Sequence, residues 1–173
     1  MAQSQTRSIR SKGDDLQKAD ASAAYEVQLS KAAEAVYEGY YSRAAEARER
    51  GEATSAHYTA LNMIDQAIDE IIPRDPFNKR YALEGNLSGI FRLKKGRMRI
   101  CWIVSSNLKR AVVIFISETL RKAGDSADPY ELIASMLMRG ELTEEFEKLG
   151  LRPPLKTQIQ RRMSGPMESN TPQ

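Results

Sequence analysis

The sequence predicts a small α+β domain built on a twisted, mostly antiparallel sheet. Two stretches with apolar residues at helical spacing come first, and three strand-like stretches follow between residues 89 and 117. One further helical pattern comes after them. The order strand, helix, helix, strand, strand, strand, helix predicts that the two early helices pack on one face of the sheet.

The two ends of the chain differ in composition from its middle. Residues 1–22 are polar and of mixed charge, and residues 151–173 carry prolines and few large apolar side chains. Such segments bury too little apolar surface to offset the entropy lost on ordering. We therefore expect one folded domain over residues 23–150, with a flexible N-terminal arm before it and a disordered tail after it.

The first half of the domain carries a strand and two helices. Residues 24–29 alternate between apolar and polar side chains, as a short strand does. Ser30 is a suitable N-cap for the helix that follows. Thr54 or Ser55 begins a second helix with isoleucines along one face, and Pro73 ends it.

The second half carries three strands and two helices. The strands are expected at residues 89–94, 97–104 and 110–117. The last of them is β-branched and aromatic almost throughout, which is typical of a central strand covered on both faces. Asp128 and the proline after it begin a helix, and a short acidic helix follows over residues 143–149.

The first two of these strands form a predicted hairpin with cationic polar positions. If Lys95 and Gly96 make a two-residue turn, the apolar side chains all share one face. The expected opposing pairs are Phe91 with Ile100, Leu93 with Met98, Arg92 with Arg99, and Lys94 with Arg97. Like charges directly opposite each other destabilise an isolated hairpin. We therefore interpret this surface as built for a polyanion, with RNA as the obvious candidate.

Positive charge is concentrated around this hairpin. The net charge of the chain is only +3, but residues 79–122 contain eleven basic residues and two acidic ones. The basic residues are Lys79, Arg80, Arg92, Lys94, Lys95, Arg97, Arg99, Lys109, Arg110, Arg121 and Lys122. Such asymmetry is typical of nucleic-acid binders, although a solvated basic surface without a dedicated partner remains an alternative.

Several classes of site have no support in the sequence. The single histidine, His57, and the single cysteine, Cys101, do not make a zinc cluster or a disulfide within the chain. No glycine-rich phosphate-binding motif follows a strand, and the basic region lacks the clustered carboxylates of a two-metal nuclease. The longest apolar run, residues 111–116, is too short to span a bilayer. We expect a cytoplasmic protein with no membrane partner, no metal and no other cofactor.

The cationic groove suits RNA cleavage without a metal. The predicted polar side of the hairpin carries Arg92, Lys94, Arg97 and Arg99, and it is expected to be open if the two early helices cover the apolar side. Arg121 and Lys122 leave the last strand beside it, and Tyr130 comes one short loop later. In such cleavage the 2′-hydroxyl attacks the adjacent phosphate, and the 5′-oxygen departs with a proton. Arginine forks match a doubly negative phosphorane, and a tyrosine can stack on a base or supply a proton.

Three segments resemble a known family. They are residues 83–121 (LEGNLSGIFRLKKGRMRICWIVSSNLKRAVVIFISETLR), residues 120–142 (LRKAGDSADPYELIASMLMRGEL) and residues 24–41 (AYEVQLSKAAEAVYEGYY). Together they resemble the RelE/ParE superfamily of type II toxin–antitoxin toxins, most closely its YhaV branch. The resemblance covers roughly residues 24–140 and implies the same element order.

The resemblance implies a translation-inhibiting toxin that cleaves mRNA without a metal, either free or on the ribosome, and is neutralised by a cognate antitoxin. By position, the phosphate-stabilising arginine of the family falls on Arg99 and its catalytic arginine on Arg121. The family tyrosine falls on Tyr130. Of the two lysines on the first hairpin strand of RelE, the second falls on Arg92 and the first on Ile90, so the general base is not carried over. The expected catalytic residues are therefore Arg92, Arg99, Arg121 and Tyr130.

Alternatives therefore stay open for the mechanism and for the function. Either Lys94 or Lys95 acts as the general base in place of the family lysine that falls on Ile90, or the mechanism differs from that of RelE. The two alternative functions are a ParE-like DNA gyrase inhibitor and a non-catalytic RNA-binding module. Neither of them needs Arg99, Arg121 and Tyr130 together. The remaining cations are expected to bind the RNA backbone, namely Lys94, Lys95, Arg97, Lys109, Arg110 and Lys122.

Overall fold

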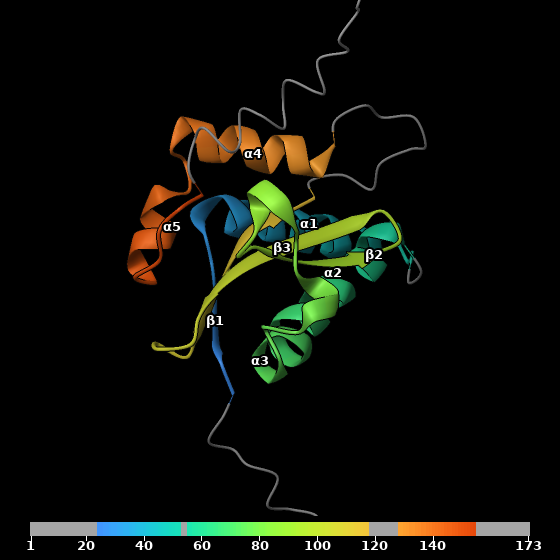
Figure 1. Cartoon of the computed structure of the whole chain (residues 1–173). Helices are drawn as coiled ribbons and strands as arrows, with labels where there is room; N and C mark the ends of the chain where they lie inside the picture. The colour runs from blue at the N-terminus through green and yellow to red at the C-terminus, as the bar shows by residue number, and fades with distance from the viewer. Residues whose placement is uncertain (1–23, 53–54, 118–127, 155–173) are drawn as a thin grey trace, which may run out of the picture.

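The structure, a computed structural model, describes residues 24–52, 55–117 and 128–154 (Figure 1). It confirms the α+β class and the predicted order of elements. The strands are β1 (Glu26–Leu29), β2 (Phe91–Lys95), β3 (Met98–Ser105) and β4 (Arg110–Ile116). The α-helices are α1 (Lys31–Glu49), α2 (Ala56–Gln66), α3 (Ile72–Arg74), α4 (Pro129–Arg139) and α5 (Thr143–Lys148).

The predicted arm and most of the predicted tail lie outside the described residues. Leu151, the first residue of the predicted tail, packs against the buried cluster beneath α4 and α5. In the described ranges, no helix is both long enough and apolar enough to cross a membrane.

The four strands form one sheet in the order β1-β4-β3-β2. β1 runs parallel to β4, whereas β4, β3 and β2 are antiparallel neighbours. The sheet is therefore mostly antiparallel, as predicted. β4 is an inner strand whose residues from Ala111 to Ile116 are all buried, which confirms that it is covered on both faces.

The hairpin register differs by two residues from the predicted one. Lys95 pairs with Met98, so the turn is made by Gly96 and Arg97 rather than by Lys95 and Gly96. Gly96 has a φ of +56°, the conformation that a type II′ hairpin turn needs at its first position and that a lysine adopts poorly. This requirement explains the shift.

The shift changes the partners but not the faces. Side chains alternate with a period of two, so a shift of two residues keeps each of them on its predicted side. The predicted opposition of Arg92 with Arg99 and of Lys94 with Arg97 is wrong, because Arg92 lies opposite Cys101 and Lys94 lies opposite Arg99. The ladder thus contains one directly opposed pair of like charges instead of two.

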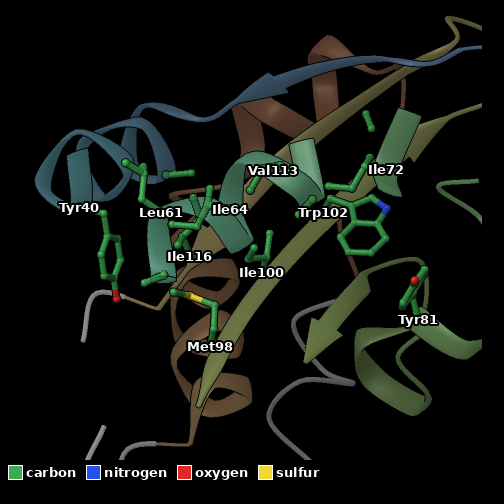
Figure 2. Close-up of a cluster of buried hydrophobic side chains, with 14 of the residues drawn as sticks. Tyr40, Leu61, Ile64, Ile72, Tyr81, Met98, Ile100, Trp102, Val113 and Ile116 are labelled. Carbon is green, nitrogen blue, oxygen red and sulfur yellow. The ribbon is translucent and has the colours of Figure 1, made fainter. Parts of the chain in front are cut away.

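The two early helices cover one face of the sheet, as predicted. Ser30 and Ser55 cap α1 and α2 through hydrogen bonds of 3.2 Å that their Oγ atoms accept. A π-helical turn (Ala67–Ile71) extends α2 into α3, where Pro73 lies in the first turn. Figure 2 shows the resulting cluster, in which side chains of these helices meet those of the sheet. Its largest fully buried members are Trp102, Tyr40, Ile64, Ile72, Met98, Ile100 and Ile116.

The opposite face is also covered, which corrects the expectation of an open charged side. α4 and α5 pack on it, and a second buried cluster forms there. Its members from the sheet include Cys101, Ile103 and Ile114, which point away from the first cluster. Central strands with apolar residues on both faces need cover on both. The cations remain accessible at the hairpin end, where Lys94 is exposed and Arg92 and Arg99 are half-buried.

Candidate active site

Three of the four predicted catalytic residues lie near one another at the hairpin end of the sheet, on the face that α4 covers. Arg92 comes from β2, Arg99 from β3 and Tyr130 from the first turn of α4. The guanidinium carbon of Arg92 lies 5.3 Å from the centre of the Tyr130 ring, a cation–π contact. Burial lowers the pKa of Arg99 below its ordinary value, and the positive charge of Arg92 lowers it further. The two guanidinium groups are therefore electrostatic neighbours.

Arg99 is held by its backbone and by its side chain. Its N–H donates to Ser117 Oγ at 3.0 Å, and its carbonyl accepts from Ser117 N at 3.0 Å. Nη1 of the side chain donates to the carbonyls of Gly96 at 2.8 Å and Met98 at 2.9 Å. These bonds fix the plane of the guanidinium through Nη1. Nε and Nη2 bind no other described residue, and such a fork matches two oxygens of a phosphate.

Arg92 has a polar atom that the described residues do not satisfy. Its Nε is buried and has no hydrogen-bond partner in the described part of the chain. A buried donor left without an acceptor costs about 1–3 kcal/mol. Because the atom is buried, only a ligand that displaced the side chains around it could satisfy this N–H.

Tyr130 owes its position to the start of α4. Asp128 is the N-cap, and its Oδ1 accepts from the Tyr130 N–H at 3.0 Å, with Pro129 in the first turn. The sequence predicted this helix start correctly. Asp128 also lies close enough to Arg99 to act electrostatically on it. The partial positive charge of a helix N-terminus adds to that of the arginines.

The hairpin cations divide between the two faces of the sheet. Lys94 lies opposite Arg99 and shares its side, and Arg97 is exposed in the turn. Lys95 does not belong to this group, because its Nζ donates to Gln66 Oε1 of α2 at 3.5 Å on the other face. As a candidate base, Lys95 is therefore not brought to the arginines, whereas Lys94 is.

The other predicted RNA-binding residues are not gathered at the site. Lys109 and Arg110 lie where β4 begins, and Arg110 pairs with Ser105 at the far end of β3. Six residues of strand separate Ser105 from Arg99, roughly 20 Å at 3.3 Å each. Arg110 is also bound to Glu26 by a salt bridge of 2.8 Å. Arg121 and Lys122 lie outside the described residues, and so their positions stay predictions.

The structure adds two residues that the sequence did not indicate. The hydroxyl of Tyr40 in α1 donates to the Ser117 carbonyl at 2.8 Å, and Ser117 in turn binds the backbone of Arg99. Tyr40 and Ser117 are 77 positions apart, and no local pattern links them. Among the residues that the structure describes, no group of three or more His, Cys, Asp or Glu lies together as a metal site.

Comparison with known families decides the family of this chain. The family model of the YhaV toxins, described as toxins with endonuclease activity of a toxin–antitoxin system, matches residues 20–152. The chain belongs to the YhaV toxin family. The resemblance stated from the sequence is thus confirmed, and the coarse function is that of a toxin with endonuclease activity from a toxin–antitoxin system.

Solved structures and curated proteins add little to the family assignment. A chain of the crystal structure of the toxin–antitoxin complex RelBE2 from Mycobacterium tuberculosis is similar, with a TM-score of 0.42 at 15% identity. The match covers 59% of this YhaV-family chain and 99% of that chain. Among curated proteins, no sequence matches this one.

Proposed function

We propose that this YhaV-family toxin is an endoribonuclease that cleaves mRNA with the 2′-hydroxyl of the substrate as nucleophile and without a metal. The observation that carries the proposal is the convergence of Arg92, Arg99 and Tyr130 from three separate elements. Two arginines beside an aromatic ring match the charge of a phosphate and the flat face of an unpaired base. The family description as an endonuclease supports a nuclease over the gyrase and non-catalytic alternatives.

In the proposed reaction the bond from the 2′-oxygen to phosphorus forms as the bond to the 5′-oxygen breaks. The products are a 2′,3′-cyclic phosphate and a 5′-hydroxyl. The Nε–Nη2 fork of Arg99 stabilises the equatorial oxygens, where charge develops. Arg92 adds a second positive charge beside Arg99. Lys94, opposite Arg99, takes the proton of the 2′-hydroxyl, and Tyr130 stacks on the base or protonates the departing oxygen.

Two further parts of the proposal come from the family. Arg121, which the resemblance makes a catalytic arginine, is proposed to complete the phosphate contacts. A cognate antitoxin is proposed to keep the toxin silent, because the family belongs to toxin–antitoxin systems. The mRNA is either free or bound to the ribosome when it is cleaved.

The products test the chemistry. Purified toxin is incubated with a transcript in the presence of EDTA, and the new ends are analysed. We expect cleavage that leaves 5′-hydroxyl ends, and no cleavage where the nucleotide 5′ of the cut is replaced by its 2′-deoxy form. Ends with a 5′-phosphate would contradict attack by the 2′-oxygen. Intact RNA together with inhibited DNA supercoiling would indicate the gyrase alternative.

The contribution of Arg99 is tested with a matched pair of variants. Arg99→Gln and Arg97→Gln remove one positive charge each, two residues apart in the same hairpin. Loss of one preorganised donor to a developing oxyanion slows turnover by about 100-fold or more. We expect this fall in turnover for Arg99→Gln and only a small effect for Arg97→Gln through weaker RNA binding. Initial cleavage rates measure both effects. Equal effects of the two substitutions would show that charge alone matters and would remove the role given to the fork.

A further inference from the structure

A row of aromatic rings leads from the core to the surface on the face opposite Arg92 and Arg99. Trp102 stacks on Phe91 with ring centres 6.0 Å apart, and Phe91 meets Phe77 edge-on at 5.7 Å. Phe77 then meets Tyr25 at 5.9 Å. The inner end is fully buried, whereas Phe77 is 41% exposed. The row therefore ends in an aromatic ring at the surface.

The loop that presents Phe77 is fixed on both sides of the ring. Trp102 Nε1 donates to the carbonyl of Pro76 at 3.0 Å. Asn78 Nδ2 donates to Asp75 Oδ2 at 3.0 Å. These bonds anchor the residue before Phe77 to the core and the residue after it to the start of the loop. The ring is thus held in place before any ligand arrives.

Several cations lie close to this row in sequence or in space. Arg74, the last residue of α3, precedes Phe77 by three positions, and Lys79 follows it by two. Lys109 Nζ lies 5.0 Å from the centre of the Tyr25 ring. Arg80 stacks on Tyr81 at 4.5 Å. None of these cations forms a salt bridge with another described residue, whereas the nearby Arg110 is paired with Glu26. Glu70 and Asp75 line one pocket with Arg74 and Arg80. Lys79 and Lys109 are therefore the exposed cations that remain to hold an anionic partner.

Lys109 reaches its position at a conformational cost. Its φ of +49° is the only positive value at a non-glycine residue in the described ranges. An L-residue with a branched or long side chain is disfavoured in this left-handed region. At this backbone position glycine or asparagine would cause less strain, yet the chain has a lysine whose side chain extends to the aromatic row.

We propose that Phe77, with Tyr25 and Lys109, is a second contact for single-stranded RNA, on which an unpaired base stacks while the cations hold its phosphates. Exposed aromatic rings beside cations are the chemistry by which proteins bind single strands without base pairing. We call this surface (Phe77, Tyr25 and Lys109) the stacking platform. The proposal rests on the proposed function, because it assigns an additional contact to the same RNA.

The two contacts lie within reach of one RNA strand. β2 is the last named strand of the sheet, and its adjacent residues Phe91 and Arg92 point to opposite faces. Ala82 bridges to the edge at Phe91, so an RNA strand that leaves Arg99 would pass around β2 between Arg92 and Lys95 to reach Phe77. About 10 Å along β2 and about 10 Å across the sheet make this path roughly 20 Å. Four nucleotides span only about 14 Å at a stacked rise of 3.4 Å each, whereas twelve span about 40 Å. Long RNA should thus use both contacts, and short RNA only the arginines.

Binding to oligonucleotides of two lengths tests the platform. Full-length toxin is titrated with 2′-O-methyl RNA of four and of twelve nucleotides, which it cannot cleave by 2′-attack. We expect Phe77→Ala to weaken binding of the twelve-nucleotide RNA about tenfold, with no change for the four-nucleotide RNA. Phe77→Tyr should keep wild-type affinity. Tyr41→Ala, which removes a ring 61% exposed on α1, serves as the control and should change neither affinity.

A second variant and a cross-link keep the test independent of folding. Lys109→Gly removes the cation and suits a φ of +49°, so the fold should be retained. We expect it to weaken binding of the longer RNA and to reduce the dependence of that binding on salt. Twelve-nucleotide RNA that carries 5-iodouridine should cross-link to the peptide that contains Phe77.

The outcomes separate the two proposals. Wild-type toxin that binds neither RNA and cleaves no transcript, free or on ribosomes, would overturn the proposed function and the platform together. Wild-type binding that Phe77→Ala and Lys109→Gly leave unchanged, with cleavage still lost in Arg99→Gln, would overturn the platform alone. Loss of binding to the antitoxin in Phe77→Ala, without loss of RNA affinity, would assign this surface to a protein partner instead.

Discussion

At the scale of single residues, the site depends on atoms that lie behind the arginines. The backbone N–H of Arg99 donates to Ser117, and the hydroxyl of Tyr40 donates to the carbonyl of Ser117. Tyr40 as a whole residue is only 1% exposed. Tyr40 touches no substrate in the proposed reaction, and so it is a positioning residue. Its effect on catalysis is expected to pass through the backbone of Arg99.

Tyr40→Phe should separate positioning from binding. The substitution removes one hydrogen bond, worth about 1 kcal/mol of folding free energy. It should lower kcat and leave KM unchanged, because Arg99 loses orientation rather than charge. Tyr37→Phe is the matched control, since the Tyr37 hydroxyl donates to Asp65 at 2.9 Å between α1 and α2. Steady-state cleavage rates check this, and equal kcat losses in both variants would mean that the effect is only one of stability.

At the scale of elements, α4 brings a side chain from beyond β4 back to the hairpin. Its start is defined by a capping aspartate and a proline in the first turn. Its end is Gly140, with a φ of +76°, where a left-handed residue closes the helix. Because Tyr130 lies one residue after Pro129, the precision of the helix start determines where the aromatic ring meets Arg92.

Asp128→Ala should weaken the helix start and the site together. Loss of an N-cap costs about 1 kcal/mol, and Tyr130 should lose its fixed position beside Arg92. We expect a lower cleavage rate that Asp128→Ser restores in large part, because serine also caps. Ser55→Ala removes the equivalent cap of α2 away from the site and should reduce stability without slowing cleavage. Thermal unfolding and initial rates measure the two effects, and unchanged cleavage in Asp128→Ala would contradict the role of the cap.

At the scale of the whole molecule, the sheet separates two buried clusters. One lies beneath α1 and α2 and the other beneath α4 and α5. Cys101 belongs to the second cluster, is fully buried, and burial raises the pKa of its thiol to about 12. At neutral pH the folded protein therefore keeps this thiol protonated and inaccessible.

Alkylation of Cys101 should report global unfolding. Only the thiolate reacts, so we expect no modification by iodoacetamide at pH 8 in the native state and rapid modification once the sheet opens. The denaturant midpoint for modification should coincide with that from circular dichroism. The unfolded thiol ionises near pH 9.0, so this group disfavours the fold as pH rises from there towards about 12. Modification at a lower denaturant concentration would show that α4 and α5 detach before the rest.

Local sequence patterns were sufficient for the elements and for the faces of the strands. Serine caps, the Asp-Pro helix start and the alternation in the hairpin are properties of a few neighbouring residues. Alternation of apolar and polar residues determines only which face of the sheet each side chain takes. The predicted faces were therefore correct, whereas the predicted pairing of the two hairpin strands was wrong by two residues. The turn geometry of Gly96 selected the register.

Long-range packing decided the site. The count of basic residues along the sequence placed Lys109 and Arg110 in one group with Arg99. In the fold the length of β3 separates them from Arg99, and Arg110 forms a salt bridge with Glu26. Lys95 belongs to the other face, and α4 and α5 cover most of the surface that alternation had left open. The secondary-structure elements, the YhaV family and the presence of Arg92, Arg99 and Tyr130 follow from the amino-acid sequence alone. Their proximity follows only from the fold, because it depends on the burial of apolar side chains that lie far apart along the chain.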